Sequence, residues 1–352
     1  MDPGAVAAEA PRPGRTPLPA ARLRELGLGA GFHLVGFARA EPLPPQTLGD
    51  WLAAGMAADM DWMAERAAER LDPGLLLPGA RTVLALGCGY RVEADDADVS
   101  PVAAYARGRD YHATLRDRLR ALRRAMRAEF PGVADYGSVD HGPVMEKVWA
   151  ARAGLGYVAR NGCLVTPRFG SWVVLAALIL DREVDAYGPG PTEDLCSRCR
   201  LCVDACPTDA LDGAGRVDAR RCLSYQTIEN AGAVPEPLRT ALEGIVFGCD
   251  ICQSVCPLNA GALPIDDVRF RPRPVAALDV RALAALSPDT YRALVPGTAL
   301  ARAGYHGLRR NAAYALGAAR DAEARPILEA LSSDPNPGVS EAARWALGRL
   351  AP

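Results

Sequence analysis

Residues 196–207 read C-S-R-C-R-L-C-V-D-A-C-P and place four cysteines at the spacing C-x2-C-x2-C-x3-C-P. At this spacing three thiolates on one tight loop can bind three irons of a single cube, while the fourth, followed by proline, turns to a neighbouring cube. Residues 249–257, C-D-I-C-Q-S-V-C-P, repeat the pattern without its first cysteine, whose position is taken by Val246. The two motifs therefore predict two [4Fe-4S] clusters.

The missing ligand is available in Cys222, which stands alone between the motifs in RRCLSYQTIE. We predict a bacterial-ferredoxin-like segment whose clusters are held by Cys196, Cys199, Cys202 and Cys256 and by Cys206, Cys222, Cys249 and Cys252. Zinc knuckles are the alternative, but two C-x3-C-P endings are not typical of zinc sites. Cys88 and Cys163 remain; both lie in apolar stretches and are expected to be ordinary buried thiols.

The composition around these motifs is that of a globular protein with several domains. The chain has 352 residues, of which 49% are hydrophobic and 23% charged, and its formal net charge is −2. The length predicts two or three domains, and the apolar fraction excludes global disorder. The balanced charge excludes a uniformly basic nucleic-acid binder, although a local basic patch could exist within it.

No export or membrane signal is recognised. The first twenty residues are rich in Pro, Ala and Gly without an apolar core, so we expect a disordered tail over residues 1–20. The longest apolar run, Trp172 to Leu180, is far shorter than the roughly 20 residues of a membrane span. We therefore expect a cytoplasmic protein without membrane contact, in which thiols stay reduced and clustered cysteines bind metal.

The residues before the cysteines alternate between predicted helices and strands. Residues 20–38 predict a short helix and a strand, and further strands are predicted at 82–90 and 172–180. Apolar residues at three- and four-residue spacing predict a helix over 114–130, and another helix is expected around 144–153. This alternation indicates an α/β layered domain over residues 21–186 within an α+β multidomain protein.

Beyond that domain the composition changes twice. Residues 187–262 are cysteine-rich with little apolar core of their own, and residues 263–352 are rich in Ala, Leu and Arg. In the last part LRRNAAYALG (308–317) is echoed by SEAARWALG (340–348), which indicates stacked HEAT-like helical repeats. An ordinary helical cap is the alternative.

Iron–sulfur cubes pass single electrons, so another centre must carry out the chemistry. No G-x-G-x-x-G turn follows a strand, and a nicotinamide site is therefore not supported. The sequence from Asp110 to His112 begins the cobalamin motif D-x-H-x-x-G, but Leu115 stands where glycine is required. His112 is accordingly expected to be a local hydrogen-bonding residue, not a cobalt ligand.

Many ordered stretches resemble the epoxyqueuosine reductase family. They are MDWMAERAAERLDPGLLLPGA (60–80), YARGRDYH (105–112), VDHGPVMEK (139–147), AGLGYVARN (153–161), GSWVVLAALIL (170–180), RRCLSYQTIE (220–229), FGCDICQSVCPLN (247–259) and LRRNAAYALG. That family is similar to reductive dehalogenases. The resemblance implies a cobalamin held base-off on the α/β domain and fed by the two clusters, and removal of the epoxide oxygen of epoxyqueuosine at the wobble position of tRNA.

The resemblance also implies roles for single residues. Asp140 matches the family's proton donor, which the chemistry needs because the departing epoxide oxygen must be protonated. Contacts to the corrinoid are implied for Arg70, Asp140, Leu164, Thr166, Leu175, Ser224, Cys249 and Asp250. From the residues alone, Asp140 would be a turn residue, Arg70 a surface charge and Leu175 part of the core. Arg160 stands where the family often has lysine.

The same resemblance implies that the partner is a tRNA anticodon stem-loop, which the helical region and the cluster segment would bind. Arginines could contact its phosphates from residues 116–127, from Arg269, Arg271 and Arg273, or from Arg302, Arg309, Arg310 and Arg320. A solvated helix face is the alternative for each group. We expect a monomer with an external electron donor. A cobalamin and iron–sulfur reductase of a small molecule, or a corrinoid-reactivating electron-transfer protein, are the competing functions.

Overall fold

Four strands form one twisted sheet in the computed structural model, which describes residues 16–93, 100–191 and 194–350. The strand order is β1 (Leu34–Arg39), β2 (Thr82–Gly89), β6 (Val173–Leu180) and β3 (Asp135–Ser138). The strands expected from the sequence at 32–38, 82–90 and 172–180 are confirmed. Alternating strands and helices often build a parallel sheet, whereas every neighbouring pair in this sheet is antiparallel.

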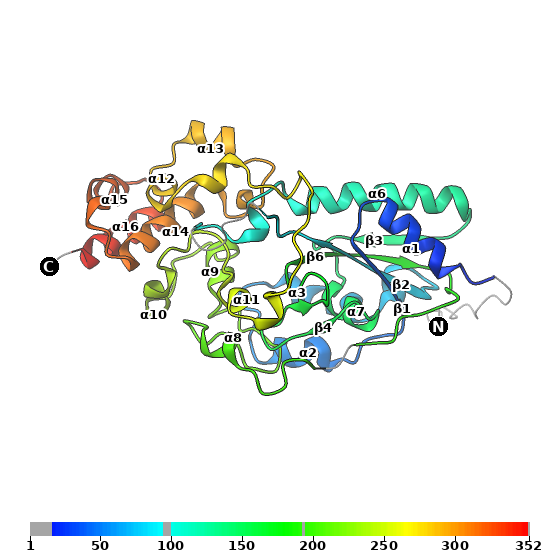
Figure 1. Ribbon diagram of the computed structural model, residues 1–352. Helices are drawn as coiled ribbons and strands as arrows, with labels where there is room; N and C mark the ends of the chain where they lie inside the picture. The colour runs from blue at the N-terminus through cyan, green and yellow to red at the C-terminus, as the bar shows by residue number, and fades with distance from the viewer. Residues whose placement is uncertain (1–15, 94–99, 192–193, 351–352) are drawn as a thin grey trace, which may run out of the picture.

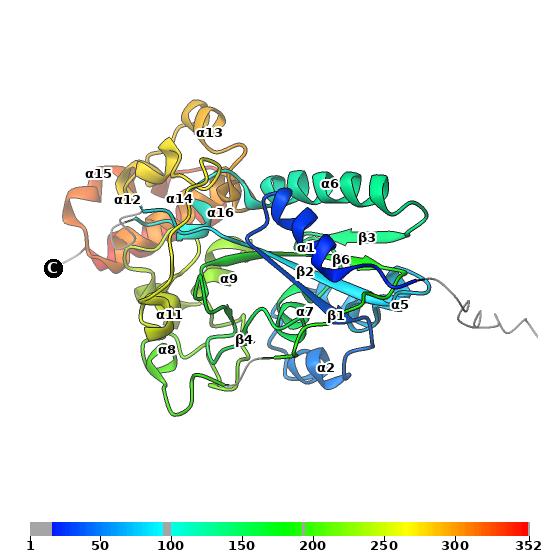
Figure 2. The ribbon, with the colours of Figure 1, turned by 45° about the vertical axis from the view of Figure 1, so that its right-hand side comes forward.

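Helices cover both faces of the sheet, as Figures 1 and 2 show. Leu84 and Leu86 of β2 face α1 (Ala20–Gly29) and α6 (Tyr111–Glu129), whereas Val83 and Ala85 face α7 (Glu146–Arg152). Successive side chains of a strand point to opposite faces, so a strand buried on both sides is apolar throughout. All eight residues of β2 are indeed buried. The short helix expected at the start of residues 20–38 and the helices expected at 114–130 and 144–153 are confirmed.

The predicted disordered tail over residues 1–20 extends too far, because its last residues are ordered parts of the fold. Leu18 is buried, and its backbone N–H donates to the carbonyl of Glu183 at 2.8 Å. Ala20 already begins α1, and its N–H donates to Asp185. Residues 1–15 of that predicted tail lie outside the described residues.

Shorter elements connect these layers. Before the cysteines they are α2 (Gln46–Ala53), α3 (Trp62–Glu65), α4 (Ala67–Leu71), α5 (Pro73–Leu76), η1 (Ala104–Ala106), β4 (Tyr157–Val158) and β5 (Leu164–Val165). The cysteine-rich segment contains α8 (Leu201–Asp204), α9 (Leu223–Ile228), α10 (Glu236–Arg239), η2 (Thr240–Leu242), α11 (Ile251–Ser254) and η3 (Pro257–Asn259). Among the described residues, no helix is both long and apolar enough to cross a membrane.

The C-terminal part is helical. It contains η4 (Pro274–Ala277), α12 (Val280–Ala284), α13 (Pro288–Leu294), η5 (Ala299–Arg302), α14 (Gly304–Ala318), η6 (Ala322–Ala324), α15 (Arg325–Ser332) and α16 (Pro337–Arg349). The two echoed stretches lie on α14 and α16, which pack so closely that a Cβ on Gly317 would meet the Cα of Ala346 at 2.6 Å. Whether these helices are HEAT-like repeats stays a prediction.

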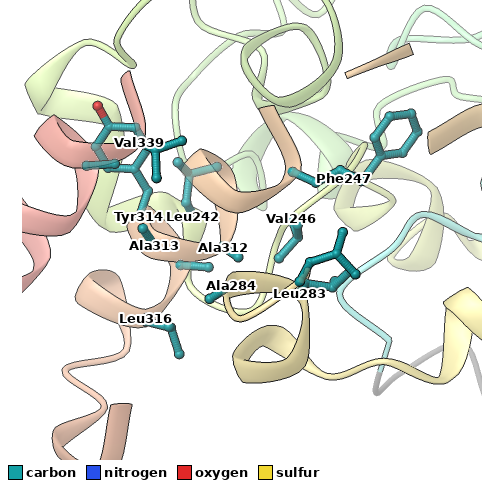
Figure 3. Packing of buried hydrophobic residues seen from close by; sticks show 14 of the residues in the cluster. Leu242, Val246, Phe247, Leu283, Ala284, Ala312, Ala313, Tyr314, Leu316 and Val339 are labelled. Atoms are coloured by element: carbon teal, nitrogen blue, oxygen red, sulfur yellow. The ribbon is translucent and has the colours of Figure 1, made fainter. Parts of the chain in front are cut away.

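The C-terminal helices share one apolar core with part of the cysteine-rich segment. Leu242, Val246 and Phe247 pack with Leu283 and Tyr314, as Figure 3 shows. Val246 therefore occupies the position of the missing cysteine as a fully buried core residue. The helices and the segment that carries Cys222 and Cys249 consequently depend on each other for burial of their apolar surface.

Two polar side chains of α14 join this core to α9. The amide of Asn311 donates to the carbonyls of Thr227 and Val246 at 2.8 and 2.9 Å. The guanidinium of Arg310 donates to the carbonyls of Gln226, Asn230 and Gly232. Because the last carbonyls of a helix lack partners within the helix, these donors supply the hydrogen bonds that the end of α9 needs.

We predict that Asn311→Leu lowers the free energy of unfolding by about 2–4 kcal/mol, since it leaves two buried carbonyls without donors. Denaturant unfolding followed by circular dichroism measures this change. His306→Gln, on the exposed side of the same helix, is the control and should stay within about 0.5 kcal/mol of the wild type. Equal stabilities of Asn311→Leu and the control would show that these hydrogen bonds do not hold α9.

Candidate functional site

A cavity of about 950 Å³ opens between the sheet, the loop before α7 and helix α9. Its wall is largely apolar: Val173 and Leu175 of β6 line it together with Leu164 of β5 and Met145. This volume lies at the upper end of the range for small-molecule sites. The cavity can therefore hold a large, mainly apolar group.

Most residues predicted to contact a cofactor lie on this wall. Arg70, Asp140, Leu164, Leu175 and Ser224 line the cavity. The structure does not place Thr166, Cys249 or Asp250 on it: the Thr166 hydroxyl donates to the Gly170 carbonyl, and Asp250 accepts from the N–H of Ala104. Contact of these three residues with a cofactor stays a prediction.

The eight clustered cysteines lie in two neighbouring groups, and their division into the two ligand sets stays a prediction. Cys196, Cys199, Cys202 and Cys256 line one small pocket of about 50 Å³. Burial raises the pKa of Cys202, and the neighbouring Cys196 and Cys256 raise it further. In the other group, burial raises the pKa of Cys249 to about 12, with added contributions from Cys222 and Cys206. Thiols from segments far apart in the chain thus lie together.

The second group reaches the large cavity through Cys222, which lies on its wall. Among the described residues, no three His, Cys, Asp or Glu side chains converge on one metal ion. A cubane does not need such convergence, because each thiolate binds a separate iron at a corner of the cube.

Of the two remaining cysteines, Cys88 is buried as expected, whereas Cys163 is only half-buried. Arg118 donates to the sulfur of the fully buried Cys88 at 2.7 Å. Cys163 lines the large cavity beside Lys147, the only lysine in the chain. Burial raises the pKa of Cys163 to about 11, whereas the nearby ammonium group lowers it. Burial in turn lowers the pKa of Lys147, whose ammonium donates to the carbonyl of Gly162 at 2.9 Å.

Asp140 lies on a constrained loop that follows β3. Its φ of +57° is in the left-handed region, which aspartate tolerates better than most residues. The carboxylate of Glu146 accepts from the backbone N–H of Asp140 at 3.0 Å and from the hydroxyl of Ser138 at 2.8 Å. A Cβ on Gly142 would lie 2.4 Å from that hydroxyl oxygen, so the loop requires glycine there. Glu146 therefore holds the loop in its observed conformation.

The Asp140 side chain accepts two hydrogen bonds from the start of α6. Tyr111 donates its hydroxyl at 2.8 Å, and Nε2 of His112 lies 2.8 Å from the same oxygen, Oδ2. Burial alone would raise the pKa of Asp140, but the bonds from His112 and Tyr111 lower it below its ordinary value. Asp140 is therefore a carboxylate in this arrangement. The expected hydrogen-bonding role of His112 is confirmed, whereas Tyr111, Glu146 and Lys147 had not been singled out from the sequence.

Several arginines expected to face a nucleic acid are engaged within the protein. Arg118 is buried and pairs with Asp267, and Arg310 is buried beneath α9, so both expectations are wrong. Acidic partners also lie beside Arg120, Arg123, Arg127, Arg269, Arg271 and Arg309. Arg302 pairs with Glu229 at the cavity and lies over the ring of Trp62. Arg160 donates to the carbonyls of Gly213 and Ser197.

Ferredoxin-type cysteine groups next to a large cavity in an α+β fold define an iron–sulfur oxidoreductase. Residues 195–259 match the family described as a 4Fe-4S double cluster binding domain, and residues 70–140 match the one described as epoxyqueuosine reductase QueG, DUF1730.

Curated relatives support the same class. The epoxyqueuosine reductase of Gloeobacter violaceus is 40% identical over 87% of this chain and 98% of its own length. That of Pseudomonas aeruginosa is 38% identical over 93% of each chain. The chain belongs to the epoxyqueuosine reductase family and is an oxidoreductase.

Solved structures agree. An epoxyqueuosine reductase bound to an epoxyqueuosine-modified tRNA-Tyr stem loop has a TM-score of 0.85 and 30% identity, covering 94% of this chain and 90% of its own. The enzyme from Bacillus subtilis, solved with a catalytic aspartate loop swung out of the active site, gives the same values.

We predict that Glu146→Gln removes part of the pH dependence of folding stability. Burial raises the pKa of Glu146 to about 7. The folded state therefore binds this proton more tightly than the unfolded state, so its stabilising effect is complete below about pH 4.5 and is lost as pH rises through 7. Between pH 5 and 8 the wild type should lose on the order of 2 kcal/mol relative to Glu146→Gln.

Unfolding free energies of both proteins across this pH range measure the difference. Glu329→Gln, on the exposed surface of α15, is the matched control and should follow the wild type. Parallel curves for Glu146→Gln and the wild type would exclude a raised pKa at Glu146.

Proposed function

We propose that this enzyme reduces epoxyqueuosine to queuosine at the wobble position of tRNA, using base-off cobalamin, two [4Fe-4S] clusters and Asp140 as proton donor. One observation carries the proposal: the wall of a single large cavity holds both Cys222 of a predicted cluster set and the hydrogen-bonded Asp140. Reduction of an epoxide needs electrons and protons at the same place, and this cavity has a source for each.

The cavity fits a corrinoid in size and chemistry. Its apolar wall, including Leu164 and Leu175, suits the faces of a flat macrocycle. Arg70 contributes a guanidinium whose Nε is buried without a partner among the described residues, and this donor would bind a polar group of the cofactor. Ser224 would contact the cofactor from α9, and further contacts are proposed for Thr166, Cys249 and Asp250, which do not line the cavity. Cobalamin supplies a cobalt centre that can be strongly reduced.

The state of His112 argues against this histidine as a ligand of the cobalt. Both of its ring nitrogens already lie within hydrogen-bonding distance of carboxylates, Nδ1 of Asp110 and Nε2 of Asp140. A cobalt ligand needs a free nitrogen lone pair. His112 therefore acts on the proton side of the reaction.

The positions of the two cysteine sets suggest a path for electrons from the protein surface to the cavity. The set containing Cys196 lies near the surface, where Leu195 and Leu201 are 58% and 52% exposed. The set containing Cys222 adjoins the cavity. We propose that the thiolates of the outer set would hold a cluster within reach of an external donor, and that those of the set containing Cys222 would hold the cluster that supplies electrons at the cavity.

The cavity mouth suits a base turned out of an RNA loop. Trp62 lies on the cavity wall, is 40% exposed, and has the Arg302 guanidinium over its ring. Unstacked bases in single-stranded RNA commonly stack on aromatic rings and arginine planes. The relative solved with a modified tRNA stem loop supports this substrate. We assign cofactor binding to residues 21–186, the clusters to 187–262 and stem-loop binding to 263–352.

We predict that the reconstituted protein, given cobalamin and a strong one-electron reductant, converts epoxyqueuosine in a tRNA stem-loop to queuosine. Asp140→Asn should lower the turnover by at least about 100-fold, the typical contribution of a general acid. Nucleoside analysis by mass spectrometry measures the product, and unchanged iron and cobalamin contents control for assembly. Near-normal turnover of Asp140→Asn would remove Asp140 as the acid. No conversion by the wild type would reject the proposed reaction.

We predict that Cys222→Ala lowers the iron content of the reconstituted protein from about eight to about four atoms per chain, because each cube holds four irons. Cys163→Ala is the matched control, since Cys163 also lines the cavity but belongs to neither set. It should keep about eight irons. An iron content near eight in Cys222→Ala would contradict the proposed ligand partition.

A further inference from the structure

The proton network at the start of α6 has a property that the proposed role of Asp140 does not explain. An acid must carry a proton before it can donate one, yet Oδ2 of Asp140 accepts from both Tyr111 and His112. A carboxylate is an acceptor only, and the bonds from these two donors favour the ionised form of Asp140 by lowering its pKa below the ordinary value. The proton for the reaction is therefore held elsewhere in the network.

The contacts of the His112 imidazole identify the group that holds this proton. Its Nδ1 lies 2.7 Å from Oδ1 of Asp110, and its Nε2 lies 2.8 Å from Oδ2 of Asp140. Carboxylate oxygens do not donate, so both ring nitrogens must carry hydrogen. The imidazole is thus an imidazolium between two carboxylates.

The backbone fixes this arrangement. Asp110 is the N-cap of α6, and its Oδ1 also accepts from the N–H of His112 at 2.9 Å. A cation in the first turn of a helix is disfavoured by the helix dipole. The two carboxylates offset that effect, and the stacked ring of Tyr111, at 4.0 Å between centroids, fixes the orientation of the imidazole.

We propose that His112 stores the proton that Asp140 delivers to the departing epoxide oxygen. This inference rests on the proposed function. The His112 Nε2–H bond breaks as an O–H bond forms on Asp140, and that proton passes to the epoxide oxygen as its carbon–oxygen bond breaks. Reduction of the epoxide to the alkene takes two electrons from the one-electron reductant and two protons, and releases one water. Solvent supplies the second proton and then reprotonates His112.

The surrounding charges favour this assignment. Burial lowers the pKa of His112, but the bonds to Asp110 and Asp140 outweigh it and raise the value to about 9. Other titratable or charged groups face His112 and Asp140. They are Tyr105, Tyr111, His141, Arg70, Glu146 and Arg302. The His141 ring lies 4.2 Å from that of His112. Because the protonated form of His112 is stabilised up to about pH 9, the imidazole carries its second proton at neutral pH.

The first test needs neither cofactor nor substrate. The chain has four histidines, so the NMR titration of each imidazole in the purified protein can be followed and the His112 signal assigned by its loss in His112→Gln. We expect His112 to stay protonated to about pH 9 and its titration to shift towards neutral pH in Asp140→Asn. A neutral His112 at pH 7 in the wild type would overturn the proposal, whatever the enzyme's activity.

The second test uses the holoenzyme and a stem-loop carrying epoxyqueuosine in single turnover. The wild-type rate should be constant below about pH 9 and fall above it. His112→Gln should be at least about 100-fold slower at pH 8, with unchanged stem-loop affinity, and its rate should rise about tenfold for each unit that pH falls. A variant with the wild-type rate and pH profile would show that Asp140 takes its proton from water.

These outcomes separate the two proposals. Failure of the wild type to convert the stem-loop rejects the proposed reaction, while the NMR titration still decides whether His112 holds a proton. Conversion by the wild type together with a pH profile unaffected by His112→Gln rejects only the proton store.

Discussion

The end of helix α9 is held by donors from α14, and the cavity depends on that attachment. Arg310 and Asn311 occupy five backbone carbonyls at and beyond the end of α9, four of them in the segment from Gln226 to Gly232. Thr227 of α9 also accepts from the N–H of Gly248, directly before Cys249. Cys222 at the start of α9 and Cys249 are thereby fixed relative to each other. A helix far along the chain thus positions one wall of the cavity and the thiols beside it.

On the Asp140 side of the cavity, the neighbouring residues must hold a loop whose backbone is strained. Residues at positive φ persist where neighbouring groups determine the backbone. Here Glu146 binds the loop from α7, while Tyr111 and His112 bind the Asp140 side chain from α6. These anchors come from helices on the two faces of the sheet. The sheet therefore sets the distance between them, and so the position of the carboxylate.

Local patterns in the sequence were sufficient to predict those features that depend only on residues close together in the chain. The spacing of Cys196 to Cys206 constrains one loop, and the pattern of apolar residues predicted β1, β2 and β6 with the helices that cover them, but not β3, which has no such pattern. Pairing over long distances was not accessible: the antiparallel sheet, the buried Arg118 and Arg310, and the contact of Glu146 with the Asp140 backbone depend on the tertiary fold. Charged side chains in particular are poorly predicted, because an arginine on an exposed face and one bonded to buried carbonyls look alike in sequence.

The charges around the cavity explain how electrons and protons could arrive together. Under the proposed function, each electron delivered to the cavity would add negative charge, which nearby carboxylates in a medium of low dielectric constant would oppose. The guanidinium of Arg70, which lies close enough to feel the charge of Asp140, and the proposed imidazolium of His112 would offset this on the Asp140 side. As negative charge accumulates, transfer of the His112 proton towards the substrate becomes more favourable. The same electrostatic field that the electrons create would therefore draw the proton across Asp140.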